Sequence, residues 1–188
     1  SSLEDLERGE LQMDIVQSDI AAAAWQGQPP FETPLKQLRS VITLLTQTVT
    51  LVTQANSGIK TVSDLNGKRV NLGKPDSEAG QTIRTLLNNC QIPESSFAAV
   101  LDMDEEAASL ALKNGEIDLF VSVSSHPVEH IWNLASREKL AFVELTGACL
   151  NEITKNNPAF IQTTIPGGLY PNVTQDARTL AVKATLVT

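Results

Sequence analysis

Short strand-like runs alternate with helical patterns from residue 57 onward, and this alternation constrains the fold more than any other feature of the chain. Arg69–Gly73 and Ile117–Val123 have the length of strands, and Ile117–Val123 is apolar except at Asp118 and Ser122. The apolar residues between Ala79 and Cys90 instead recur at helical spacing. Strands that alternate with helices are typical of βαβ units, in which a helix joins two parallel strands. The sequence therefore predicts an α/β fold with a mostly parallel sheet.

The first 56 residues follow the same alternation with shorter elements. Ser2 and Asp5 have the spacing of a capping box before a first helix, and Met13–Gln17 predicts a strand. Val41–Thr53 is uncharged and rich in β-branched residues, so it predicts one or two further strands. The other predicted elements are helices at 20–25 (capped by Ser18 and Asp19), 62–65, 105–114, 127–136 and 147–156, and strands at 97–101, 140–145 and 179–187.

The composition excludes several classes of function. The chain has 22 Asp and Glu against 14 Lys and Arg, a net charge of −8, whereas a protein that binds nucleic-acid phosphates needs a basic face. We therefore expect no nucleic-acid partner. No apolar run approaches the roughly 18 residues of a spanning helix. Cys90 and Cys149 leave two interpretations open, a disulfide in an exported protein or two buried thiols.

One string resembles a catalytic motif. His126-Pro127-Val128-Glu129-His130 matches H-x-x-E-H, whose two imidazoles can share a zinc ion beside a carboxylate base. Pro127 places His126 before the helix rather than inside it, however, and the chain has no third histidine. The chain also lacks a G-x-S-x-G elbow, a P-loop and a G-x-G-x-x-G loop. We therefore expect a protein that is not an enzyme and that needs no metal and no cofactor.

The best candidate for binding is the loop at 71–80, which joins a predicted strand to a predicted helix. Free N–H groups at that helix start, together with the Ser77 hydroxyl, suit a carboxylate or a phosphate. The alternative is an ordinary N-cap formed by Asp76 and Ser77, and Asp76 and Glu78 would repel an anion. Both interpretations stay open. A second clue is that Ser18 and Ser124 each follow a predicted strand, at the edge where open α/β sheets bind ligands.

Several strings, in order along nearly the whole chain, resemble one protein family. They are Gly9-Glu10 with Ile15–Ala21, Ser57–Val70, Gly115–Asp118, Pro127, Thr164–Pro171 and Thr179–Thr188. Together they resemble the TAXI-family solute receptors, which are the extracytoplasmic binding subunits of tripartite ATP-independent periplasmic (TRAP) transporters. The resemblance begins at the second or third element of that family, so we expect a receptor that is truncated at both ends.

The resemblance implies a periplasmic-binding-protein-like, two-lobed α/β fold with a ligand between the lobes. Residues 1–48 and 180–188 would form part of the first lobe with hinge strands, and residues 49–179 a nearly complete second lobe, with crossovers at 46–55 and 179–188. The implied ligand is a small organic anion or amino acid, glutamate-like or a dicarboxylate, passed to membrane permease subunits from a periplasmic or other extracytoplasmic position. The implied ligand-binding residues are Gln17, Ser18, Asp19, Ser77, Glu78, Ala79, Ser124, Ser125 and Tyr170.

One departure from the family and two alternative functions accompany this interpretation. The loop that is Gly-rich in the family reads Asp76-Ser77-Glu78-Ala79 here, and its two acids favour a ligand with an ammonium group or a changed role for the loop. The effector domains of LysR-type regulators share the two-lobed architecture, so such a domain is the first alternative. A metal-dependent hydrolase that uses His126, Glu129 and His130 is the second.

Overall fold

One eight-stranded sheet, with helices on both of its faces, organises the chain. The computed structural model describes the backbone of residues 1–188 and every side chain except that of Cys149, so the pairing of Cys90 with Cys149 lies outside the described residues. The helices are α1 (Ser2–Glu7), α2 (Ser18–Gln26), α3 (Glu78–Asn89), α4 (Glu105–Lys113), α5 (Glu129–Ala135) and α6 (Ala148–Asn156), with short 3₁₀ helices at Val62–Leu65 and Glu94–Ser96. The strands are β1 (Asp14–Gln17), β2 (Ser40–Gln54), β3 (Arg69–Asn71), β4 (Ala99–Leu101), β5 (Leu119–Ser124), β6 (Leu140–Phe142), β7 (Phe160–Ile165) and β8 (Ala177–Val187). None of the described helices is both long and apolar enough to cross a membrane.

The sheet is mixed rather than mostly parallel. Its strands follow the order β1-β8-β2-β5-β3-β4, with β6 added to β2 and β7 added to β8. Among the described strands, β3 pairs in parallel with β4 and β5, whereas every pair that involves β2 or β8 is antiparallel. The expected α/β class is confirmed, but the expectation of a mostly parallel sheet is wrong. The reason is that β2 carries the chain from one end of the molecule to the other and β8 carries it back, so these neighbours run in opposite directions.

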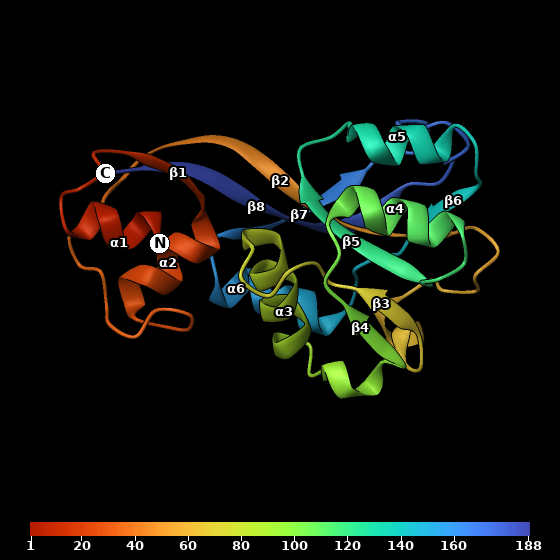
Figure 1. Ribbon diagram of the computed structural model, residues 1–188, viewed down its shortest axis with the longest axis horizontal. Coiled ribbons are helices and arrows are strands. Elements are labelled where there is room, and N and C mark those ends of the chain that lie inside the picture. Colours follow the sequence, from red (N-terminus) through yellow and green to blue (C-terminus); the bar gives the residue numbers. More distant parts are fainter.

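β2 and β8 are 15 and 11 residues long and connect the two ends of the molecule (Figure 1). The first part of β2 pairs with the last part of β8, next to β1; we call this end, with α1 and α2, the small lobe. The second part of β2 pairs with β5 and β6 in the large lobe, which holds α3 to α6. The predicted crossovers at 46–55 and 179–188 overlap these two strands, and the lobe boundaries at 1–48, 49–179 and 180–188 stay a prediction.

β5 shows why helices cover both faces of the sheet. Successive residues of a strand point to opposite faces. Leu119, Val121 and Val123 pack into a core with α3 and α6, whereas Phe120 packs into a second core with α4 and α5. A third, smaller core packs α1 and α2 against β1 and the end of β8. The apolar pattern of this strand, which only Ser122 interrupts before its last residue, is therefore that of a strand buried on both faces.

Two helices in the small lobe begin one or two residues before the predicted positions. The capping box of α1 is formed by Ser1 and Glu4, one position before the predicted pair. α2 begins at Ser18 with Gln17 in the N-cap position, so Ser18 and Asp19 lie inside its first turn instead of capping it. Runs of polar residues offer several neighbouring caps, and the packing of the following apolar residues selects one of them.

α5 and β7 also differ from the sequence-based expectations. α5 begins at Glu129 after the N-cap Val128, two residues later than Pro127 predicts. Phe160–Ile165 forms a strand that the sequence pattern does not predict. Its inner residues alternate between half-buried and exposed, because the strand lies at the border of the sheet beside β8. A strand with so few buried residues has a weak apolar pattern.

Truncation of two leucines should lower the free energy of unfolding by different amounts, because only one of them lies in the core under α3. Leu86 on α3 is fully buried, whereas Leu110 on α4 is 58% exposed. Leu86→Ala leaves a cavity among packed side chains, so we expect the free energy of unfolding to fall by about 2–5 kcal/mol. Leu110→Ala, the matched control, should change it by less than about 0.5 kcal/mol. Urea denaturation followed by circular dichroism measures both values, and equal losses would contradict the placement of Leu86 in the core.

Candidate ligand-binding site

The small and large lobes meet through buried polar side chains. Gln17 at the end of β1 and Asp19 in the first turn of α2 both contact the hydroxyl of Thr82 on α3. Thr82 Oγ1 lies 2.6 Å from Gln17 Oε1 and 2.7 Å from Asp19 Oδ2. Gln17 Nε2 donates to Gln47 Oε1 on β2 at 2.6 Å. Gln17, Asp19 and Thr82 are at most 6% exposed, so two of the predicted site residues join the lobes through buried hydrogen bonds.

Counting protons in this network shows that it has two charge states. The Thr82 hydroxyl has one proton, so it donates to one neighbour and accepts from the other. With the Gln17 amide donating to Gln47, Thr82 donates to Gln17 and a protonated Asp19 donates to Thr82. With both amides turned over, Gln17 donates to Thr82, and Thr82 donates to an ionised Asp19. Burial raises the pKa of Asp19, although the Thr82 hydrogen bond lowers it, and this shifts the network toward the protonated state.

A second carboxyl group borders the same contact. Glu78 begins α3, and its side chain is exposed overall. Partial burial of its carboxyl end raises the pKa of Glu78, the charges of Asp19 and Asp14 raise it further, and the backbone N–H of Gln17 opposes the shift. Negative charge therefore gathers where the lobes meet, and it opposes their contact unless a proton or another cation is held there.

A polar cavity of about 530 Å³ opens beside this contact, and we call it the polar cleft. Its walls come from α2, β2 and β8 on one side and from α3 and α6 on the other. Ser18, Asp19 and Lys183 line it. Its other polar lining residues are Gln26, Gln28, Ser40, Thr43, Thr85, Asn89, Asn156, Asn157 and Thr185. Asp19 Oδ1 is buried and makes no hydrogen bond with the described part of the protein, so a ligand donor would satisfy it.

Ser18 fixes one wall of the polar cleft. Its hydroxyl donates to the backbone carbonyl of Lys183 at 2.8 Å and lies 2.6 Å from Thr185 Oγ1. Because the Ser18 proton goes to the carbonyl, the Thr185 hydroxyl donates to Ser18 Oγ. These bonds attach the start of α2 to β8, and they hold Asp19 and Lys183 in place around the same space.

The helix start at α3 is satisfied by its own residues. Ser77 Oγ accepts from the Gly80 N–H at 3.1 Å and donates to the Lys74 carbonyl at 2.7 Å, which is ordinary N-cap geometry. A Cβ on Gly80 would lie 2.0 Å from the same carbonyl oxygen, so the loop packs tightly on the helix. Ala79 packs against the core under α3. The Ser77 hydroxyl is therefore occupied, and Ser77 and Ala79 as ligand contacts stay predictions.

The structure does not bring Ser124, Ser125 and Tyr170 into the polar cleft. Ser124 ends β5 opposite Thr48 of β2, and Ser125 Oγ donates to a β2 carbonyl at 3.0 Å. Tyr170 is 2% exposed in the core under α4 and α5, where its hydroxyl accepts from the Val128 N–H at 2.7 Å. None of the three lines the walls of the polar cleft. Their role as ligand contacts stays a prediction.

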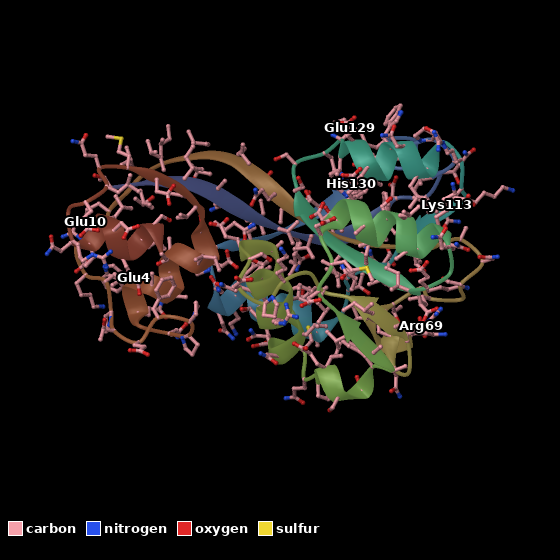
Figure 2. The ribbon with its side chains drawn as sticks, in the orientation of Figure 1. Glu4, Glu10, Arg69, Lys113, Glu129 and His130 are labelled. Carbon is pink, nitrogen blue, oxygen red and sulfur yellow. The ribbon has the colours of Figure 1, made fainter. Side chains whose placement is uncertain are left out.

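The two histidines of the H-x-x-E-H string have different partners. His126 Nδ1 contacts the Tyr170 hydroxyl, and His126 Nε2 lies 3.0 Å from Thr50 Oγ1. His130 lies beside Glu129 on α5 (Figure 2), with its Nε2 3.0 Å from Glu105 Oε2. In the part of the chain that the structure describes, no three His, Cys, Asp or Glu side chains group as a metal site. This geometry gives the hydrolase alternative no support.

Sequence reasoning missed most residues of the polar cleft, although two of them carry a signal. Thr82 lies on the apolar stripe of α3, three residues after Ala79, and a polar residue on a buried stripe needs a buried partner. Lys183 is the one charged residue in the predicted strand 179–187. The lining asparagines of α3 and α6 lie at helix ends, where asparagine is common, so they carry no signal of their own.

Comparison with known proteins places the chain in a family. The sequence profile of the NMT1-like family matches residues 1–188, the full length of the chain. The chain belongs to the NMT1-like family.

Solved structures with the same fold agree with the two-lobed arrangement. A periplasmic sulfonate-binding protein SsuA from Methylobacillus flagellatus KT is 14% identical, with a TM-score of 0.51 over 99% of this chain and 44% of that protein. A protein from Xanthomonas citri bound to ATP is 14% identical, with a TM-score of 0.57 over 98% of this chain and 61% of that protein. The CcmR regulatory domain of Synechocystis PCC6803, in complex with 2-PG, is 14% identical, with a TM-score of 0.52 over 98% of this chain and 67% of that domain. The expected two-lobed, periplasmic-binding-protein-like fold is confirmed, and the chain spans less than half the length of the sulfonate-binding protein.

Asp19→Asn should stabilise the protein at neutral pH. Because the pKa of Asp19 is raised above the ordinary 3.8, its contribution to stability is complete below about pH 3.8 and is lost as the pH rises through the raised value. Asparagine keeps the shape, donates to Thr82 and does not ionise. The gain in free energy of unfolding over the wild type should be absent in acid and grow to a plateau above the raised pKa. Urea titrations across this pH range measure it; the exposed control Asp102→Asn should show no gain. A gain that does not change with pH would contradict the argument.

His126→Gln should remove a second dependence of stability on pH, opposite in sign to that of Asp19. The Val128 N–H donates to the Tyr170 hydroxyl, which also contacts His126 Nδ1. Burial lowers the pKa of His126, so its contribution to stability is present above about pH 6.5 and is lost as the pH falls. The wild-type melting temperature should therefore fall between pH 7 and pH 5 more steeply than that of His126→Gln. Equal slopes for the wild type and His126→Gln would contradict the argument.

Proposed function

We propose that this chain is the solute-binding part of an extracytoplasmic receptor that captures a small organic anion or amino acid between its lobes. The observation that carries the proposal is the polar cleft between the lobes, which is lined by Lys183 and by the buried carboxyl of Asp19. Membership of the NMT1-like family and the fold shared with a sulfonate-binding protein support it.

The charges around the polar cleft suit a small acid that also carries a donor. The Lys183 ammonium attracts a carboxylate or a sulfonate, and Asp19 Oδ1 accepts a hydrogen bond from an ammonium or hydroxyl group. A glutamate-like amino acid satisfies both groups at once, and a dicarboxylate satisfies Lys183 when Asp19 is protonated. Lys183 and Asp19 lie on one wall of the polar cleft, and Asn89 and Asn156 line the opposite wall. A ligand that contacts both walls stabilises the arrangement with the lobes together, so binding favours closure by a hinge motion. Binding and release need no chemical step, so we propose no enzymatic role.

We further propose that the loaded receptor passes its ligand to membrane permease subunits. The strings that resemble TAXI-family receptors support a TRAP-type permease. The sulfonate-binding neighbour is described as part of an ABC transporter, which supports delivery to a permease of another type. The genes beside the one that encodes this chain distinguish the two, because a TRAP permease is a secondary transporter without an ATPase subunit. Both cases place the chain outside the cytoplasm.

The effector domain of a regulator is the second candidate function. A regulatory domain, that of CcmR, shares the fold with a TM-score of 0.52. A regulator needs a helix-turn-helix segment in the same protein, whereas a receptor needs an export signal. The coding sequence upstream of Ser1 distinguishes these two functions directly.

A thermal-shift screen tests the receptor. Amino acids, dicarboxylates and sulfonates at millimolar concentration are added to the chain, and at least one should raise the melting temperature by several degrees, because a ligand of the folded state stabilises it by mass action. Lys183→Met should abolish the shift caused by an acid, whereas Lys139→Met, which changes an exposed lysine of the large lobe, should keep it. The absence of a shift with every compound would contradict the proposed function.

A further inference from the structure

A second hollow of about 620 Å³ lies next to the polar cleft along α2. The two hollows share the lining residues Ser18, Ala22, Gln26, Ser40 and Thr185, so they adjoin each other. We call the second hollow the apolar annex. The side chains of Ser18 and Ala22, which are small, lie at the border between the two hollows.

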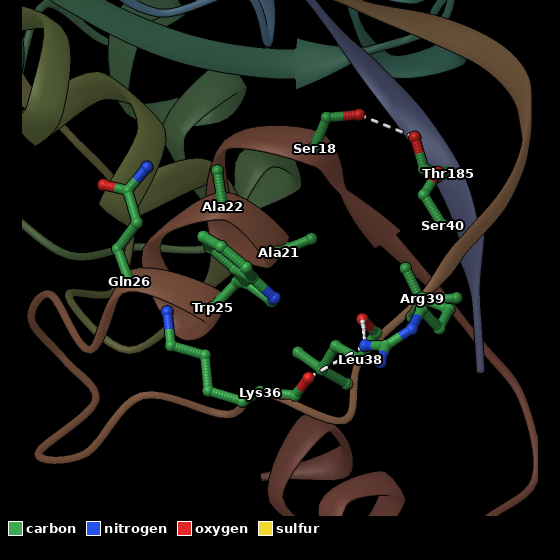
Figure 3. A pocket seen from close by; sticks show the side chains of 11 residues that line it. Ser18, Ala21, Ala22, Trp25, Gln26, Lys36, Leu38, Arg39, Ser40 and Thr185 are labelled. Carbon is green, nitrogen blue, oxygen red and sulfur yellow. Dashed lines mark hydrogen bonds between the residues drawn. The ribbon is translucent and has the colours of Figure 1, made fainter.

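The walls of the apolar annex differ in chemistry from those of the polar cleft. The apolar residues that line the apolar annex are Ala21, Ala22, Trp25, Leu38 and Val187, and Figure 3 shows Trp25 among the side chains that line it. Trp25 is 47% exposed, so much of this large apolar residue is accessible to water. The Lys36 ammonium lies over its indole ring, 3.5 Å from the ring centroid.

The wall opposite α2 is held in a defined shape. Arg39 Nη1 donates to the backbone carbonyls of Lys36 and Leu38, at 2.8 Å in each case. These bonds fix the turn at residues 36–39 and keep Lys36 over Trp25. The segment that lines the apolar annex opposite α2 is therefore held by side-chain hydrogen bonds, and Trp25 lines the annex from α2 (Figure 3).

We propose that the ligand is an amphipathic acid, with its charged head in the polar cleft and an apolar tail in the apolar annex against Trp25. This inference rests on the proposed function and names the class of ligand for that site. The carboxylate of the head is held by the Lys183 ammonium. A tail of several carbons passes Ala22 and covers Trp25, which removes apolar surface of both partners from water. A short, wholly polar acid leaves this surface exposed and so binds more weakly.

Straight-chain carboxylates from butanoate to octanoate test the inference by isothermal titration calorimetry. Each methylene that enters the apolar annex should strengthen binding about fourfold, the ratio that corresponds to burial of one methylene group. Trp25→Ala should weaken octanoate at least tenfold and butanoate little. Ala22→Leu, which narrows the passage, should reduce octanoate to the affinity of butanoate. Trp132→Ala is the matched control, because Trp132 is 45% exposed on α5 of the large lobe, and it should change neither affinity.

Fluorescence gives a second measurement that does not depend on affinity. The chain has two tryptophans, so Trp132→Phe leaves Trp25 as the sole indole reporter. Saturating octanoate should shift its emission to shorter wavelength, because the tail displaces water from the ring. Saturating butanoate should leave the emission unchanged. An octanoate complex without this shift would overturn the position of the tail.

The outcomes separate failure of this inference from failure of the proposed function. Equal affinities for butanoate and octanoate, or binding of glutamate and succinate alone, would overturn the amphipathic ligand and leave the receptor function intact. Binding of no acid at all would overturn both. A chain that is dimeric by light scattering and becomes monomeric on Trp25→Ala would assign the apolar annex to a second copy, and this too would overturn the inference.

Discussion

The antiparallel pairing of β2 with β8 is the interaction on which the rest of the structure depends. The ladder runs from Ser40 opposite Val187 to Thr48 opposite Ala181, and β2 then continues into the large lobe beside β5. It attaches the small lobe to the large one and gives the start of α2, through Ser18, a fixed place against β8. Two register shifts in the small-lobe half allow the strands to bend there. Any closing motion of the lobes must therefore bend this pair of strands, and every group of the polar cleft moves with it.

Two buried titratable groups give the lobes opposite responses to pH. Asp19 at the lobe contact is more stable without charge, so acid favours that contact. Burial in the large lobe favours the neutral form of His126, so acid works against the packing there. Among the described residues, neither group has a charged partner that would favour its ionised form, and burial is the main cause of both shifts. The contribution of Asp19 to stability therefore falls as the pH rises, whereas that of His126 falls as the pH decreases.

Much of the fold could be predicted from local patterns, and the exceptions have identifiable causes. α3 and α4 have strong apolar periodicity with a side-chain N-cap, Ser77 and Asp104, and both lie close to their expected positions. β5 was predicted from its apolar run. The direction of the strands was not predictable in this way, because it depends on which strands become neighbours after β2 and β8 have crossed between the lobes. β7 was not predicted because a border strand with exposed threonines has no strong pattern.

The sequence by itself determined the α/β class and the place of Gln17 and Asp19 where a strand passes into a helix, because local periodicity is readable without neighbours. The two-lobed arrangement was implied by the resemblance of its ordered strings to a known family. Only the tertiary structure decided that Thr82 and Lys183 join Asp19, whereas Tyr170 is buried in another core. The physical reason is that a binding site forms from side chains of distant segments, and the packing of those segments, rather than the spacing of residues along the chain, brings them together.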